Sequence, residues 1–224
     1  MHFSVELRQR ANAMPDSTAC VVVIDDDPEF LESLGRLLRS VGLHPYLFAS
    51  IADFMASEPP DGPTCLVLDV RLPGRSGLDF QRDLAAARVN LPIVFMTGHG
   101  DIPMTVQAIK AGAIEFLTKP FRDQELLDAV YDGLARDRAR REDELALSAL
   151  RARFEELTPR ERAILIQVVG GRLNKQIAGE MGITETTVKV HRSNMMRKIK
   201  AESVAELCRM VDKLKLLPEN SRRS

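Results

Sequence analysis

The sequence predicts an α/β protein with a doubly wound, five-stranded parallel sheet, followed by a small all-α domain of four helices. Up to about residue 134, short runs rich in β-branched residues alternate with helical patterns, as they do in βαβ units. Four short helical patterns follow between residues 157 and 217. The charge divides near the same place: residues 1–153 carry a net charge of −6 and residues 154–224 a net charge of +5. Such a division indicates two parts with different partners.

The five predicted strands are apolar runs bounded by polar residues. We place them at residues 20–24, 45–48, 65–68, 93–96 and 114–117. The helix after the first strand is capped by Asp27, with Pro28 in its first position. Further helices are expected near residues 77–87 and 102–111. Because parallel strands are joined by crossover helices, both faces of the sheet are expected to be covered.

Polar side chains with related chemistry stand where four of these strands end. Asp25 and Asp26 follow the first strand and Asp69 follows the third. Thr97 follows the fourth strand and Lys119 the fifth. In an open parallel sheet, ligands bind outside the carboxyl ends of the strands. We therefore expect three carboxylates, a hydroxyl and an ammonium group to meet in one crevice.

The chemistry available to such a crevice is narrow. Adjacent carboxylates repel one another and need a cation, and an all-oxygen ligand set suits Mg²⁺ better than zinc. A carboxylate beside Mg²⁺ and a fixed ammonium group can attack phosphorus and become an aspartyl phosphate. Lys119 would balance charge on the phosphoryl oxygens, and Thr97 could donate a hydrogen bond to one of them.

Two alternatives stand beside this interpretation. Each residue alone has a simpler explanation as a helix cap, a strand end or a surface charge, and only their joint occurrence favours a site. The second alternative is an enzyme that hydrolyses small phosphate esters through the same aspartyl-phosphate chemistry. Such hydrolases place the nucleophile in a DxD arrangement after the first strand, whereas Asp69 follows the third.

The composition excludes several classes of protein. No apolar run approaches the ~20 residues of a membrane span. Residues 1–17 lack the apolar core of a secretory signal. The three cysteines form no CxxC pair, so a disulfide framework and a structural zinc site are not expected. A cytoplasmic location with no membrane partner follows as the expectation.

The segment between the two domains, residues 135–156, contains neither Gly nor Pro. Its composition favours a helical linker over a flexible coil. The simplest interpretation is one long solvated helix end, and whether this segment also self-associates is left open.

The C-terminal part carries the signals of four capped helices. Thr158 and Glu161 form a capping box with Pro159 between them, and Gly170-Gly171 end the first helix. The second helix is expected from Asn174, as its cap, to Met181. The third is expected at residues 185–200 and the fourth at 202–216. Short helices with a tight turn between the second and third indicate a helix-turn-helix.

The third of these helices has two distinct faces. Val188, Met195 and Ile199 recur at spacings of seven and four, so they are expected to face the core. The opposite face combines a cation, an apolar side chain, a hydroxyl and an amide, which suits base edges and phosphates in a major groove. This face carries Lys189, Val190, Ser193, Asn194 and Arg197.

The first domain resembles the receiver domain of two-component response regulators. The resemblance spans residues 19–134 and rests on VVVIDDD, CLVLDVRLPGRSG, IVFMTGHGD and GAIEFLTKPF, in this order. It implies a flavodoxin-like fold, with Asp69 as the phosphoacceptor and Lys119 as a phosphate contact. It further implies a Mg²⁺ site made by Asp25 (through water), Asp26, Asp69 and the backbone carbonyl of Arg71. The same resemblance makes Thr97 and Phe116 the switch residues.

The second domain, residues 157–217, resembles the LuxR-type DNA-binding domain. The matching text is LTPRER followed by GGRLNKQIAGEMGITETTVKVHRSNMMRKI. The resemblance implies that Lys175 contacts a phosphate and that Lys189, Val190 and Ser193 face bases. The candidate DNA-binding set also includes Arg192, Asn194 and Arg197. The closing helix resembles the dimer surface of this family, although a plain core stripe would have the same pattern.

Together the two domains resemble a response regulator of the NarL/FixJ type. We expect a phosphorylation-dependent transcription regulator whose partners are a sensor histidine kinase, double-stranded promoter DNA, RNA polymerase and, on activation, a second copy of the chain. We do not expect an enzyme, beyond self-phosphorylation from a donor and autodephosphorylation at Asp69. The alternative is a phosphate-independent DNA-binding regulator that uses its receiver only as an interaction module.

Overall fold

The computed structural model describes residues 19–98 and 102–214 of the chain. The chain divides into two compact units between Asp143 and Glu144. Within the described residues the N-terminal unit holds two hydrophobic clusters, and the C-terminal unit holds one.

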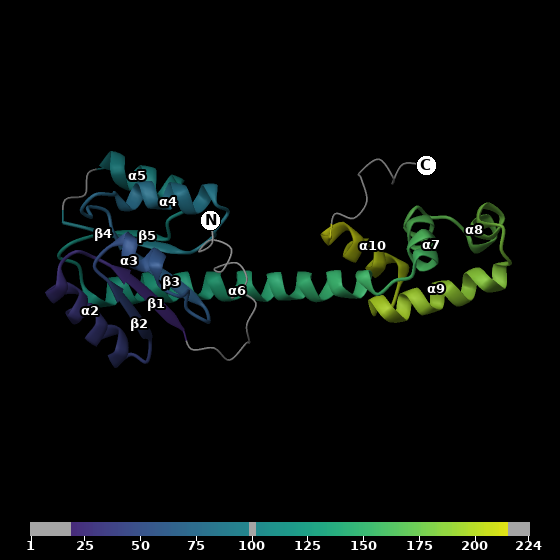
Figure 1. Ribbon diagram of the computed structural model, residues 1–224, viewed down its shortest axis with the longest axis horizontal. Helices are drawn as coiled ribbons and strands as arrows, with labels where there is room; N and C mark the ends of the chain where they lie inside the picture. The colour runs from purple at the N-terminus through teal and green to yellow at the C-terminus, as the bar shows by residue number, and fades with distance from the viewer. Residues whose placement is uncertain (1–18, 99–101, 215–224) are drawn as a thin grey trace. The chain divides into compact units, whose positions relative to one another are not determined.

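A five-stranded parallel sheet forms the centre of the N-terminal unit (Figure 1). Its strands are β1 (Cys20–Ile24), β2 (His44–Phe48), β3 (Thr64–Asp69), β4 (Ile93–Thr97) and β5 (Glu115–Thr118). Their order is β2-β1-β3-β4-β5, so the winding reverses between β1 and β3. The predicted fold class is confirmed, and every predicted strand end lies within one residue of the observed one.

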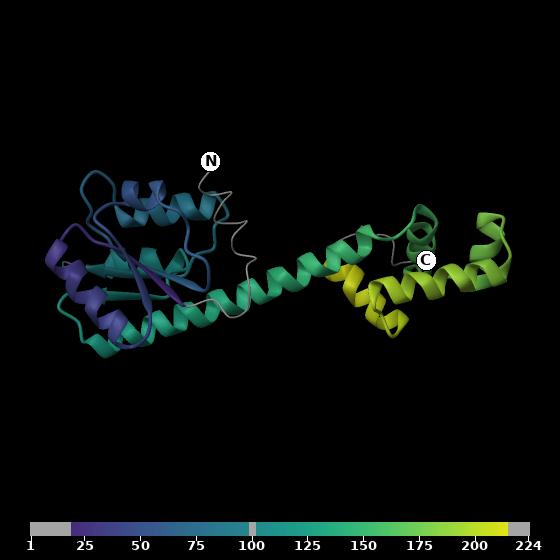
Figure 2. The same ribbon diagram turned by 60° about the horizontal axis from the view of Figure 1, so that its bottom comes forward.

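Helices cover both faces of this sheet, as the two views show (Figures 1 and 2). One face packs against α2 (Pro28–Ser40) and α6 (Asp123–Glu155). The other packs against α3 (Ile51–Ala56), α4 (Gly77–Ala86) and α5 (Ile102–Lys110). All five residues of β1 and all six of β3 are buried, which explains why these strands read as continuous apolar runs.

Local sequence signals fix where the helices begin. The carboxylate of Asp27 accepts hydrogen bonds from the backbone N–H groups of Glu29 and Phe30, so Asp27 caps α2 as predicted. Helix α3 was not predicted; Ser50 caps it by accepting from the backbone of Asp53. With only six residues, α3 is too short to show a helical period in the sequence.

Helix α6 is 33 residues long and continues past the end of the N-terminal unit. Its first part belongs to the sheet-covering layer, where Leu126 and Val130 are fully buried. Residues 135–155 continue the same helix, in the segment for which the sequence predicts a helical linker.

The C-terminal unit contains α7 (Pro159–Val169), α8 (Asn174–Met181), α9 (Glu185–Ile199) and α10 (Val204–Lys213). The Thr158–Glu161 capping box of α7 is present as predicted, and Thr184 caps α9. The cap assigned to Asn174 is wrong: Asn174 is the first helical residue, and the N-cap is Leu173. The side chain of Gln176 accepts a hydrogen bond from the backbone of Leu173 and so satisfies that helix end. The predicted end of the fourth helix, residues 215–216, lies outside the described residues.

Candidate functional site

The predicted strand-end residues come together at the carboxyl edge of the sheet. Asp25 follows β1, Asp69 is the last residue of β3, and Lys119 follows β5. The ammonium nitrogen of Lys119 lies 2.5 Å from Oδ2 of Asp25 and 2.8 Å from Oδ2 of Asp69. This meeting point is where the strand order reverses, which is where ligands bind in doubly wound sheets.

The third carboxylate, Asp26, completes an acidic cluster. One carboxylate oxygen from each of Asp25, Asp26 and Asp69 lies within 4.8 Å of the others. Asp25 and Asp69 are buried, whereas Asp26 is exposed and lines an open hollow together with Arg71. The backbone N–H of Arg71 donates to Oδ1 of Asp69 at 2.8 Å, which leaves Oδ2 to Lys119.

Lys119 is held from several sides. Its backbone N–H donates to the carbonyl oxygen of Thr97 at 2.7 Å, which fixes the end of β5 against β4. Its ammonium group also lies 4.0 Å from the centre of the Phe30 ring, a cation–π contact. Burial alone would lower the pKa of Lys119, but its hydrogen bonds to Asp25 and Asp69 outweigh burial, so the pKa is raised and the group stays charged.

The charges of the site fit a divalent cation. Three carboxylates meet one ammonium group, so two negative charges are uncompensated among Asp25, Asp26, Asp69 and Lys119. Burial raises the pKa of Asp25, and the neighbouring Asp69 carboxylate acts in the same direction. The first effect is the loss of hydration of the charged form, and the second is repulsion between the two carboxylates. A donor set made only of carboxylate oxygens, open to water at Asp26, has the chemistry that Mg²⁺ prefers.

The two residues predicted as a switch lie on one face of the sheet. Thr97 is fully buried at the end of β4. Phe95 lies opposite Phe116 in the register of β4 and β5, with ring centres 6.3 Å apart. Because side chains alternate along a strand, Thr97 shares a face with Phe95 and therefore with Phe116. Phe116 is half-buried against the cluster that α4 and α5 cover.

A close backbone approach constrains the carboxyl end of β3, where Asp69 lies. A Cβ atom on Gly77, the first residue of α4, would lie 2.4 Å from the carbonyl oxygen of Asp69. The backbone N–H of Gly77 also donates to the carbonyl of Val70 at 3.0 Å. Glycine is therefore required for α4 to begin directly against the end of β3.

The second candidate site is the outer face of α9. Val188, Met195 and Ile199 are fully buried, as the spacing predicts. Lys189, Val190, Ser193 and Arg197 are exposed, and Asn194 is half-buried. Within the helix, Lys189 pairs with Glu185 at 3.5 Å, and Arg197 donates to Asn194 at 3.1 Å.

Two further residues of the predicted DNA-binding set lie on α8 or contact it. Lys175 is exposed in its first turn. Arg192 is half-buried and donates to Oδ1 of Asn174 at 2.9 Å, which ties α9 to the start of α8.

One buried charged group carries no signal in the sequence. The side chain of Asp137 on α6 is fully buried and accepts from the backbone of Thr64, from Arg140 and from Arg141. It joins α6 to the start of β3, at the sheet end opposite the acidic cluster. In the sequence Asp137 stands within a run of alternating charges, which is typical of a solvated helix face.

Comparison with known proteins identifies the family of each unit. Residues 21–131 match the response regulator receiver domain, and residues 155–211 match the luxR family of bacterial regulatory proteins. The chain is 50% identical to Nodulation protein W of Bradyrhizobium diazoefficiens over 92% of this chain and 91% of that protein. It is 44% identical to the transcriptional regulatory protein FixJ of Azorhizobium caulinodans over 88% of this chain and 93% of that protein.

Solved structures agree with these matches. The response regulator StyR superposes with a TM-score of 0.79 at 48% identity, over 88% of this chain and all of that chain. Full-length FixJ from B. japonicum gives a TM-score of 0.53 at 35% identity, over 92% of this chain and all of that one.

A receiver domain and a LuxR-type DNA-binding domain in one chain define a response regulator that regulates transcription. This chain belongs to the NarL/FixJ type of response regulators. The family consists of regulators rather than catalytic enzymes, and its receiver domains work with histidine kinases and bind Mg²⁺ at an acidic pocket. Among the described residues, no helix is long and apolar enough to cross a membrane.

Proposed function

We propose that a sensor histidine kinase phosphorylates Asp69 of this chain and that the phosphorylated receiver changes how the C-terminal domain binds promoter DNA. The observation that carries the proposal is the position of Lys119, whose ammonium group contacts Asp69 and Asp25 at once. If Asp69 carried a phosphoryl group, the phosphoryl oxygens would lie within reach of that ammonium group.

In this proposal the transfer step takes place at the Asp69 carboxylate. A carboxylate oxygen of Asp69 forms a bond to phosphorus, the bond from phosphorus to the donor's histidine nitrogen breaks, and the imidazole leaves with the electron pair. Mg²⁺, held by Asp26, Asp69, the carbonyl of Arg71 and, through water, Asp25, would supply charge neutralisation for the phosphoryl oxygens. Lys119 donates to one of these oxygens, while the backbone N–H of Arg71 holds the other oxygen of Asp69 in place.

The response to the new charge involves Thr97 and Phe116. The Thr97 hydroxyl turns to donate to a phosphoryl oxygen, and the space it leaves on the shared face lets the ring of Phe116 move inward. Phosphorylation is then a local charge event that biases a two-state element. The changed surface, formed by α5 and β5, is where two activated receivers pair.

The output is DNA binding through α9. Lys189, Val190 and Ser193 meet base edges in the major groove, Lys175 and Arg197 contact phosphates, and Arg192 and Asn194 support this face. A dimer presents two such helices to half-sites about one helical turn apart. RNA polymerase is a further partner in this proposal, which places the protein in the cytoplasm.

The test is phosphorylation of the full chain with Mg²⁺ and a radiolabelled small acyl phosphate. We expect label on the parent protein, none on Asp69→Asn, and none when the divalent cation is chelated. Equal labelling of Asp69→Asn would overturn the assignment of the acceptor. DNA affinity that is the same with and without phosphate would instead favour a phosphate-independent regulator.

A further inference from the structure

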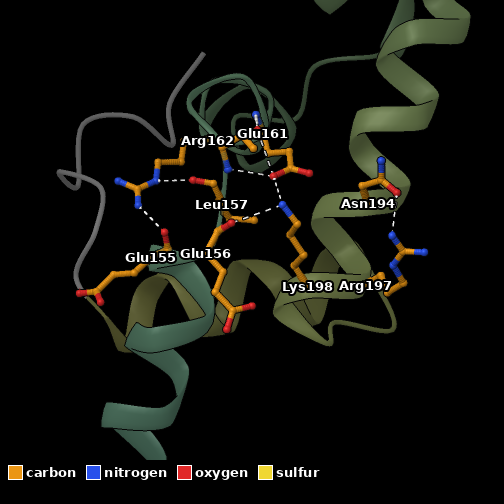
Figure 3. A network of polar contacts seen from close by, with 9 residues as sticks. Glu155, Glu156, Leu157, Glu161, Arg162, Asn194, Arg197 and Lys198 are labelled. Atoms are coloured by element: carbon orange, nitrogen blue, oxygen red, sulfur yellow. Dashed lines mark hydrogen bonds and ion pairs between the residues drawn. The ribbon is translucent and has the colours of Figure 1, made fainter.

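The end of α6 is joined to α7 and α9 by a cluster of polar contacts (Figure 3). The Glu161 cluster, as we call it, comprises the side chains of Thr158, Glu161, Arg162 and Lys198 and the backbone carbonyls of residues 155–157. The ammonium group of Lys198, on α9, lies 2.7 Å from Oε2 of Glu161 on α7. It also donates to the carbonyl oxygen of Glu156 at 3.3 Å.

These contacts complete the end of a long helix. The last carbonyls of a helix have no partners within the helix and carry its partial negative charge. Arg162 donates to the carbonyl oxygens of Glu155 and Leu157, at 2.9 Å and 3.2 Å. Together with Lys198, it places two cations, one from α7 and one from α9, at the carboxyl end of α6.

Glu161 is the centre of the cluster and is only 4% exposed. Its Oε2 accepts from Lys198, from the backbone N–H of Thr158 and from the Thr158 hydroxyl. A buried carboxylate with this many donors has one well-defined position. The pair with Lys198 therefore fixes the last turn of α9 against the start of α7.

Lys198 does not belong to the face that reads DNA. It stands five positions after Ser193, which places it about 140° away around the helix at about 100° per residue. Its side chain is 30% exposed and its ammonium group is occupied by the Glu161 cluster. Its neighbour Arg197, in contrast, is exposed on the reading face.

We propose that Glu161 and Lys198 are positioning residues for DNA recognition, because their ion pair sets where Lys189, Val190 and Ser193 lie along the groove. The inference rests on the proposed function in one respect, namely that α9 reads the DNA. If the pair only stabilised the fold, its loss would lower binding to all DNA sequences equally. A positioning role instead lowers the preference for the correct sequence, since phosphate contacts tolerate small shifts that base contacts do not.

The experiment uses the full chain and two DNA duplexes of equal length. One duplex is selected by the parent protein from a random-sequence pool, and the other has a random sequence. For Lys198→Met we expect about tenfold weaker binding to the selected duplex and less than about twofold change on the random duplex. The slope of log affinity against log salt stays at the parent value, and Lys198→Arg keeps the parent affinity. The matched control is Lys200→Met, which removes an exposed cation at the same helix end and should affect both duplexes alike.

Other outcomes would contradict the proposal. Equal losses on both duplexes would show a merely structural pair, and a salt slope smaller by about one would show a direct phosphate contact. Unchanged binding would also overturn it. If Lys198→Met fails to fold in a thermal melt, Glu161→Gln provides the same test, because it keeps the size of the side chain and removes the charge. If the parent selects no duplex at all, the proposed function of α9 fails first, and this inference fails with it.

Discussion

The ammonium group of Lys119 lies 2.8 Å from Oδ2 of Asp69, although 50 positions separate the two residues in the chain. The same ammonium group contacts Asp25, so it is the common counter-charge of both buried carboxylates. In the proposed phosphoryl transfer, Lys119 would neutralise the Asp69 carboxylate before transfer and a phosphoryl oxygen after it.

Replacing this cation gives the first prediction. Lys119→Met should reduce the rate of acyl-phosphate labelling of Asp69 by about 100-fold, because a preorganised charge at the reacting oxygens is lost. Lys110→Met, which removes an exposed lysine from α5, is the control and should label at the parent rate. Comparable rates for the two variants would show that Lys119 has no part in transfer.

The neighbouring residues Asp26 and Asp27 allow a matched test of the metal site. Asp26→Asn should weaken Mg²⁺ binding by about tenfold or more, because it removes a charged oxygen ligand. Asp27→Asn should change it by less than about twofold, since the Asp27 carboxylate already caps α2 and asparagine caps equally well. Titration calorimetry with Mg²⁺ separates the two, and an equal loss in both variants would argue against Asp26 as a ligand.

The buried Asp137 leads to a prediction about stability. Asp137→Ala should lower the free energy of unfolding by about 3–5 kcal/mol, because it leaves the buried Arg141 without its counter-charge. Asp132→Ala, on the same helix, breaks only an exposed pair with Arg136 and should cost less than about 1 kcal/mol. Urea unfolding of both variants measures the difference, and similar costs would mean that burial adds nothing to the Asp137 contacts.

The Glu161 cluster should make stability depend on pH in a defined direction. Burial alone would raise the pKa of Glu161, but hydrogen bonds from Lys198 and Thr158 outweigh it and hold the pKa below its usual value. The charged form is therefore favoured by folding, so its stabilisation is complete above the ordinary Glu value of about 4.3 and is lost as the pH falls through the lowered pKa.

The measurement compares unfolding midpoints of the parent and Glu161→Gln. The parent should be more stable at pH 7, and the gap should close as the solution is acidified below about pH 4. A gap that stays constant between pH 7 and pH 3 would show that the charge of Glu161 does not contribute.

The proposed DNA contact of Lys175, an exposed cation on α8, can be tested independently of α9. Lys175→Ala should weaken binding to every duplex and reduce the salt slope by about one, the signature of one lost phosphate contact. Arg138→Ala removes an exposed cation from α6, in the other unit, and should leave the slope unchanged. A slope that does not respond to Lys175→Ala would remove this residue from the DNA contacts.

The sheet and the residues at its strand ends could be predicted from the sequence, because the signals are local. Runs such as Cys20–Ile24 are buried on both faces and read as strands without ambiguity. Once the strands are parallel, topology alone brings Asp25, Asp69 and Lys119 together. The roles of these residues in phosphoryl transfer and of the α9 face in DNA binding remain predictions.

The features that escaped prediction depend on distant partners or on very short elements. Helix α3 has too few residues for a period, and Leu173 at the start of α8 has no side-chain acceptor that would mark a cap. The sequence pattern marks Glu161 as part of a capping box, but its ion pair with Lys198 joins residues 37 positions apart. In the sequence Asp137 is one of several charged residues in a run, and only its contact with the start of β3 in the fold distinguishes it.

The carboxyl end of α6 has a practical consequence for dissecting this protein. The hydrophobic cluster of the C-terminal unit includes Leu150 and Phe154 of α6 and the following Leu157. Arg162 and Lys198 donate hydrogen bonds to the backbone carbonyls at this helix end. A DNA-binding fragment that begins at the start of α7 would expose the apolar side chains of this cluster to water. It would also leave Arg162 and Lys198 without their carbonyl acceptors at the end of α6. Fragments and chimaeras should therefore be cut upstream of Leu147, so that the graft carries its own last turns of α6.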